Sequence, residues 1–248
     1  MILLYHHVAP LDRTPALPQR DESWHFSITP EQLGRHIDTL RGRGYRFCSL
    51  TSMVNEIKTT GRLAPRQVAV TLDDGWADNF DHAFPVFQDR KLPATFFVTT
   101  GHLRDNRKDP VRMSGPQLRE LTKHGMEVGA HTRTHPDLAR LNIDQAREEI
   151  GGSRQDLEQL LGQSVDLLAY PGGSFNRQVA TVAAEAGYRA ACSVIGLGIN
   201  DPDTMYWLYR DTLSGQLNTW RDRLRMSGIG HGLLNGRARK RVSGMLGE

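Results

Sequence analysis

The stretch TLDDGW, residues 71–76, follows the apolar run VAV at 68–70 and contains two adjacent carboxylates, Asp73 and Asp74. Neighbouring acids at the end of a buried strand repel each other and resist removal from water, so the pair requires a compensating partner. One interpretation is that a carboxylate caps a helix that begins near residue 77. The other is that the pair binds a divalent cation, and the rest of the sequence has to distinguish the two.

Apolar runs and helical patterns alternate along the chain on both sides of this stretch. Strands are predicted at 2–5, 68–72, 94–100, 126–130, 166–170, 188–194 and 206–213, and helices from residue 30 to about 42 and at 77–90, 115–124, 143–161 and 179–186. Strands that are apolar on both faces and alternate with helices are typical of a parallel sheet covered by helices. The predicted fold is therefore α/β, a distorted (β/α) barrel of about seven parallel strands.

Polar residues gather where the predicted strands end. His6 follows the first strand, Asp73 and Asp74 follow the second, His131 follows the fourth, and the turn YPGG at 170–173 follows the fifth. In a barrel of parallel strands the carboxyl ends surround one opening, where catalytic groups collect. These four strand ends therefore predict a single site.

The segment HTRTH, residues 131–135, supplies two histidines to that site. A helical zinc-protease motif has a glutamate after its first histidine, but Thr132 stands there and His131 ends a strand, which disfavours that class. His131, His135 and Asp74 can instead hold a divalent metal, with an open position for water. Asp73, pointing the other way along an extended chain, would then serve as general base.

Composition limits the classes of protein to which the chain can belong. The 248 residues carry a formal net charge of +3 and 38% hydrophobic residues, which is typical of a globular protein and not of a nucleic-acid-binding one. The two cysteines, Cys48 and Cys192, predict reduced thiols. No apolar run is long enough to span a bilayer and the N-terminus does not match a signal peptide, so a cytoplasmic location is expected.

The chain divides into a catalytic domain over 1–215 and a basic, glycine-containing tail over 216–248. The tail has seven Arg or Lys residues against two acids, which predicts a solvated, partly mobile segment. Its alternative interpretation is an element that approaches anionic surfaces.

The motifs resemble those of the polysaccharide deacetylases with the NodB homology domain, carbohydrate esterase family 4. TLDDG is similar to the family's first motif, TFDDG, which implies that Asp73 is the catalytic base and Asp74 a metal ligand. HTRTH is similar to the second motif, which implies that His131 and His135 bind the metal. The resemblance extends from about residue 29 to 195. It implies a distorted barrel and metal-dependent removal of acetyl groups from N-acetylated oligo- or polysaccharides, commonly with zinc.

Two departures from the family pattern concern catalysis. The third motif, usually R-x-P-Y, reads AYPGG here, with Ala169 in place of the base-orienting arginine. The N–H of Gly172 can still stabilise the oxyanion, since that role needs no side chain. Arg210 is an alternative orienting group, although an arginine at such a place is more often a surface charge. AYPGG and the N-terminal YHH resemble the branch that deacetylates poly-N-acetylglucosamine.

The general acid is the second departure, because the family's L-x-H motif has no clear counterpart. His6 at the predicted strand end is the favoured candidate, and His231 is interpreted as an exposed residue of the tail. An amide nitrogen leaves poorly unless it is protonated, so a chain without this acid would act better on esters.

Alternative functions remain open. A carbohydrate-binding protein could keep the metal site without turnover, and a glycosidase could pair Asp73 with Glu185, which would leave the histidines unused. Trp76 and Tyr170 could stack on a sugar or belong to the core, and Arg133 could contact substrate or be a surface charge. No glycine-rich nucleotide-binding loop is present.

Overall fold

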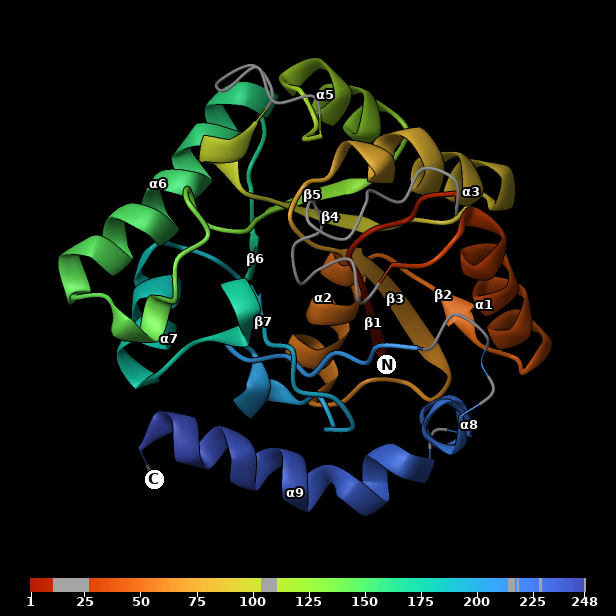
Figure 1. The fold of residues 1–248 in the computed structure, drawn as a ribbon. Helices are drawn as coiled ribbons and strands as arrows, with labels where there is room; N and C mark the ends of the chain where they lie inside the picture. Colours follow the sequence, from red (N-terminus) through yellow and green to blue (C-terminus); the bar gives the residue numbers. More distant parts are fainter. Residues whose placement is uncertain (11–26, 104–110, 214–216, 218, 228, 248) are drawn as a thin grey trace, which may run out of the picture.

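A computed structural model describes residues 1–10, 27–103, 111–213, 217, 219–227 and 229–247. Its centre is a curled parallel sheet in the order β1-β3-β4-β5-β6-β7, with β2 paired to β3 (Figure 1). The strands are β1 (Ile2–Tyr5), β2 (Arg46–Phe47), β3 (Gln67–Leu72), β4 (Thr95–Val98), β5 (Glu127–Ala130), β6 (Leu167–Ala169) and β7 (Ala190–Cys192). The predicted fold class, a distorted (β/α) barrel, is confirmed.

Helices surround the sheet on its outer face (Figure 1). They are α1 (Pro30–Gly42), α3 (Phe84–Arg90), α5 (Gly115–Lys123), α6 (Ile143–Leu161) and α7 (Arg177–Glu185), with short turns at Asn79–Ala83, Thr100–His102, Leu138–Arg140, Pro171–Gly173 and Pro202–Thr204. Thr29 and Asn142 form capping boxes at the starts of α1 and α6, as the local sequence favours. The predicted helix at 77–90 is a π-helical turn followed by α3, because Pro85 has no N–H to continue one regular ladder.

The predicted last strand, 206–213, forms two isolated bridges instead of a regular strand. Leu208 pairs with Cys192 of β7, and Asp211 pairs with Leu3 of β1. The Leu208 N–H donates to Ala191 at 2.8 Å, and the Asp211 N–H donates to Ile2 at 2.7 Å. The segment therefore lies between the two outermost strands and closes the barrel through these two bridges.

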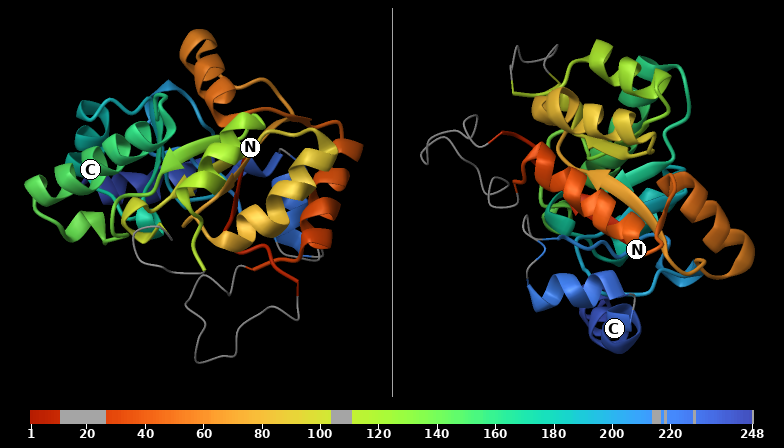
Figure 2. Two further views of the ribbon diagram at one scale, coloured as in Figure 1. Left: turned by 90° about the horizontal axis from the view of Figure 1, so that it is seen from above. Right: turned by 90° about the vertical axis from the view of Figure 1, so that its right-hand side faces the viewer.

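Residues 46–60 contain β2 and a helix, α2 (Leu50–Thr60), that the sequence analysis missed. The signal was present, with Ser49 as N-cap, apolar residues at helical spacing and Gly61 in a left-handed C-cap. α2 projects from one end of the barrel (Figure 2). Its buried face packs in one cluster with residues inside the barrel: Ile2, Ala69, Phe97, Leu167, Ala169, Ala190, Cys192 and Leu208. α2 therefore seals the barrel at the end where the strands begin.

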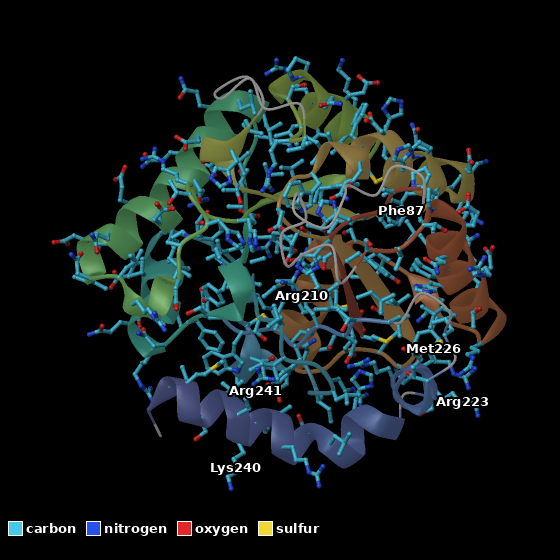
Figure 3. The ribbon with its side chains drawn as sticks, viewed as in Figure 1. Phe87, Arg210, Arg223, Met226, Lys240 and Arg241 are labelled. Carbon is cyan, nitrogen blue, oxygen red and sulfur yellow. The ribbon has the colours of Figure 1, made fainter. Side chains whose placement is uncertain are left out.

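The predicted solvated tail differs from the structure. Residues after 219 form α8 (Trp220–Ser227) and α9 (Ile229–Leu246), which run beside the closing segment (Figure 1). Met226, Ala238 and Val242 are buried in the main core, while Lys240 points away from the molecule (Figure 3). The buried residues Ala238 and Val242 are four apart on α9, but they are too few to be recognised among the seven basic residues of the whole tail. Composition alone therefore predicted a solvated tail where the chain forms packed helices. Among the described residues no helix is long and apolar enough to cross a membrane.

Candidate metal site and its base

Asp73 and Arg210 form a buried ion pair inside the barrel. Arg210 is 1% exposed, and its two terminal nitrogens each donate to one oxygen of Asp73 at 2.7 Å. It also donates to the Thr71 hydroxyl at 3.1 Å and to the Ser193 carbonyl at 2.8 Å. A bidentate contact of this kind favours the ionised carboxylate and fixes its orientation.

Arg210 thus contacts Asp73 in the way expected of a base-orienting arginine. That group had no candidate in the third motif, where Ala169 stands in place of the arginine. The interpretation of Arg210 as a surface charge is wrong, since its guanidinium lies in the middle of the ring of strands (Figure 3). Burial by itself raises the pKa of Asp73, but the charges of Arg210 and His131 outweigh it and hold that pKa below its usual value. The carboxylate is therefore ionised and can accept a proton.

Asp74 follows in a left-handed conformation, with φ of 76°, and Gly75 continues the turn with φ of 73°. Aspartate tolerates this region better than most residues. The turn directs Asp74 Oδ1 to within 3.3 Å of Nε2 of both His131 and His135. The ligand atoms of these three residues all lie within 4.8 Å of one another. The structure therefore brings together the three residues that the sequence predicted as ligands.

The cluster fits a divalent metal. His131 Nδ1 lies 2.7 Å from the Ala169 carbonyl, which can only accept, so Nδ1 carries the proton and Nε2 is left as a donor atom for a metal. Tetrahedral bonds of about 2.0–2.2 Å separate neighbouring ligand atoms by about 3.4 Å, close to the 3.3 Å found here. His135 is 41% exposed, so the cluster opens to solvent on that side.

Electrostatics favour a cation at this cluster. Burial raises the pKa of Asp74, but hydrogen bonds with His131 and His135 hold it well below its usual value. Burial lowers the pKa of His131, but Asp74 and Asp73 raise it above normal overall. The same negative potential that favours a proton on His131 favours a metal ion in its place.

The loop that carries both histidines is held by α6 and the turn at 100–102. The N–H groups of Arg133 and Thr134 both donate to Glu149 at 2.8 Å. Arg133 also pairs with Asp156, so its interpretation as a surface or structural charge is favoured over a substrate contact.

The backbone of this loop is strained at two residues, since Thr132 and His135 have φ of 64° and 63°. A β-branched residue at such an angle is strained, which is common at functional sites.

Gly172 lies in the turn directly after β6, the strand whose last residue, Ala169, accepts from His131 through its carbonyl. Its φ is 58°, and it is exposed. Within the turn, Gly173 and Ser174 donate to Tyr170 and Pro171, whereas the Gly172 N–H has no acceptor among the described residues. A donor in this position can bind an oxyanion.

His6 is half-buried directly after β1. Tyr5 pairs with Leu72, so His6 and Asp73 follow adjacent strand ends. Burial lowers the pKa of His6, and the negative charges of Asp73 and Asp74 oppose this shift without cancelling it. The other histidine considered as an acid, His231, is on α9 with Nε2 2.6 Å from Asp211. It belongs to the outer side of the closing segment and not to this cluster.

The aromatic candidates and the glycosidase partner lie elsewhere. Tyr170 is fully buried and donates to the Tyr206 carbonyl at 2.9 Å, so it is a core residue. Trp76 is 6% exposed and donates to Asp74 at 3.0 Å, which leaves little surface for a sugar. Glu185 is exposed in the last turn of α7, where its partner is Arg147. A cavity of about 500 Å³ lies away from all of these, between the loop at 61–67 and α9.

Fold and site together define a parallel (β/α) barrel with a His-His-Asp cluster and a second, arginine-bound carboxylate at its carboxyl-end opening. The polysaccharide deacetylase family model matches residues 60–191, more than half of the chain. The chain belongs to the polysaccharide deacetylase family.

Individual relatives are distant. The chain is 25% identical over 192 residues to YxkH of Bacillus subtilis, covering 75% of this chain and 66% of that protein. It is 25% identical over 199 residues to a poly-β-1,6-N-acetyl-D-glucosamine N-deacetylase of Staphylococcus aureus, covering 76% and 68%. The chain thus spans about two thirds of the length of these relatives.

Solved structures share the fold. The deacetylase PplD of Streptococcus pyogenes superposes with a TM-score of 0.77 at 24% identity, covering 87% of this chain and 92% of that one. IcaB from Ammonifex degensii gives 0.73 at 22% identity, covering 92% and 94%. Both comparisons support the barrel architecture.

Proposed function

We propose that this chain is a metal-dependent N-deacetylase that removes acetyl groups from an N-acetylated oligo- or polysaccharide. The observation that carries the proposal is the meeting of Asp74 with His131 and His135 next to an ionised Asp73. The three ligands come from two loops more than 50 residues apart, and a purely structural role explains neither their convergence nor the open side at His135. Zinc is the metal expected for two imidazoles and one carboxylate.

Each residue of the site has a separate role in amide hydrolysis. A divalent cation held by Asp74, His131 and His135 would supply Lewis acidity, which activates water and polarises the acetyl carbonyl. Asp73 accepts the proton as the oxygen of water bonds to the carbonyl carbon, and Arg210 keeps its carboxylate in one orientation. The Gly172 N–H donates to the carbonyl oxygen as that atom becomes negative.

His6 completes the reaction by donating a proton to the nitrogen as the carbon–nitrogen bond breaks, which releases acetate and a free amine. Its position directly after β1, beside the strand end that leads into Asp73, supports this role. The substrate class follows from the S. aureus relative, whose name gives it poly-β-1,6-N-acetyl-D-glucosamine. We therefore expect a polymer of N-acetylglucosamine as substrate.

The test combines metal analysis with acetate release. Purified wild type, loaded with zinc, should release acetate from an N-acetylglucosamine oligomer, whereas His135→Ala should lose both bound metal and acetate release. Asp73→Asn should keep its metal and lose activity by about 10²- to 10⁴-fold, since it removes only the base.

Three results would contradict the proposal. Metal content that is unchanged in His135→Ala would reject the ligand assignment. Wild type that binds zinc but releases no acetate would support the alternative, a carbohydrate-binding protein without turnover. Chain shortening instead of acetate release would indicate a glycosidase.

A further inference from the structure

Trp76 is packed tightly beside the candidate metal site. Its ring centroid lies 4.2 Å from that of His7, and the guanidinium carbon of Arg112 lies 3.3 Å from the ring centroid. His7 is itself 1% exposed, with Nδ1 2.5 Å from an oxygen of Asp78. Contacts of this kind leave the indole little freedom to rotate or shift.

The indole N–H is directed at a metal ligand. Trp76 Nε1 donates to Oδ2 of Asp74 at 3.0 Å, while Oδ1 of the same carboxylate lies 3.3 Å from Nε2 of His131 and of His135. The two oxygens of Asp74 therefore have different partners. A hydrogen bond to Oδ2 fixes the rotation of the carboxylate, and this rotation decides whether Oδ1 faces the histidines.

Arg112 holds the backbone of the same ligand. Its Nη1 donates to the Asp74 carbonyl at 2.7 Å. The segment 111–113 also pairs with 75–77, since the Ala77 N–H donates to Val111 at 2.8 Å and the Met113 N–H donates to Gly75 at 2.9 Å. These bonds fasten the left-handed turn at residue 74, which an unrestrained aspartate seldom adopts.

We propose that Trp76 and Arg112 are positioning residues that set the metal affinity of the site by holding Asp74. Trp76 orients the carboxylate, and Arg112 fixes both the indole and the backbone of the turn. The segment 111–113 thereby becomes part of the metal site although it supplies no ligand. The inference rests on the proposed function, because it takes Asp74 to be a ligand.

The experiment measures zinc affinity by competition with a chromophoric chelator. Trp76→Phe retains a stacking ring but loses the N–H, and Arg112→Ala loses the bond to the Asp74 carbonyl. Both variants should bind zinc about 10- to 100-fold more weakly than wild type. Trp207→Phe and Arg119→Ala are matched controls, since Trp207 stacks on Phe175 and Arg119 donates to Leu160, and both should stay within about twofold.

A spectroscopic readout separates positioning from general stability. The cobalt-substituted forms of Trp76→Phe and Arg112→Ala should show altered visible absorption, because the coordination of Asp74 changes, while both controls match wild type. Arg112→Lys keeps a cationic donor and should recover part of the affinity that Arg112→Ala loses. Arg112 is half-buried, so substitutions there are expected to be tolerated by the fold. If Trp76→Phe does not fold, the Arg112 variants alone test the proposal.

Zinc affinity and cobalt spectra equal to wild type in both Trp76→Phe and Arg112→Ala would overturn the inference. This failure differs from failure of the proposed function, which would appear as absence of metal binding by wild type itself.

Discussion

At the scale of single residues, the role of the proton donor can be distinguished from that of the base by comparing substrates with different leaving groups. His6→Gln removes the proposed acid without touching a ligand. Hydrolysis of the N-acetylglucosamine oligomer should fall by about 10²- to 10⁴-fold, because the amide nitrogen leaves unprotonated. Hydrolysis of 4-nitrophenyl acetate should fall much less, since its phenolate leaves readily. Equal loss on both substrates, at unchanged zinc content, would contradict the assignment of His6 as the acid.

The ion pair between Asp73 and Arg210 makes a second prediction at this scale. Arg210→Met would leave the buried Asp73 carboxylate without its main partner and should reduce the free energy of unfolding by about 3–5 kcal/mol. Adding Asp73→Asn removes the isolated charge, so the double variant should be more stable than Arg210→Met alone. Urea unfolding of the wild type, both single variants and the double variant measures this coupling; strict additivity would contradict it.

At the scale of elements, Glu127 joins β5 to the start of α2. Its carboxylate accepts from the N–H of Leu50 at 3.0 Å and of Thr51 at 3.2 Å, and from the Thr95 hydroxyl at 2.7 Å. An anion at a helix N-terminus also interacts favourably with the helix dipole. The carboxylate therefore anchors the helix that seals the barrel.

Glu127→Ala should reduce the free energy of unfolding by about 1.5–3 kcal/mol, the usual loss for hydrogen bonds to a charged group. The urea midpoint measures the change. Glu120→Ala, an exposed glutamate on α5, is the control and should stay within about 0.5 kcal/mol of wild type. A loss no larger than that of the control would show that α2 holds its place by apolar packing alone.

At the scale of the whole molecule, Asp211 joins the barrel closure to the C-terminal helices. Its backbone bonds to β1, while its carboxylate lies 2.6 Å from His231 of α9 and 3.5 Å from Arg225 of α8. Burial raises its pKa, but the hydrogen bond and charge of His231, the Leu197 N–H and Arg225 lower it below the usual value overall. Because the folded pKa is the lower one, the stabilisation is present above the unfolded pKa and is lost as the pH falls through the folded pKa.

Asp211→Asn should therefore be less stable than wild type by about 1.5–3 kcal/mol at pH 5. The difference should shrink as the pH falls from about 4, the pKa of the unfolded carboxylate, through the lower folded pKa, where the native carboxylate takes up its proton. Urea unfolding at pH 5 and pH 3 measures it, and Asp203→Asn, at an exposed site, serves as control. A difference that is the same at both values would rule out the Asp211 carboxylate as its source.

The barrel and the members of the His-His-Asp cluster could be predicted because their signals are local. The apolar run before Asp73 and the spacing of His131 and His135 each involve residues within a few positions of one another. The helix α2 was missed although its caps and apolar spacing were also local. The proposed roles of Gly172 and His6 came from motif and strand position, and they stay predictions.

Sequence by itself determined most of the strands and helices before residue 195, and which side chains stand at the strand ends, since backbone hydrogen bonds and side-chain periodicity depend on near neighbours. Only the tertiary structure decided that Arg210 faces Asp73 from 137 residues away, that Arg112 holds the turn at Asp74, and that α9 packs on the closing segment. The physical reason is that these contacts depend on how the sheet curls and closes, which brings together residues whose separation along the chain carries no information about their distance in space.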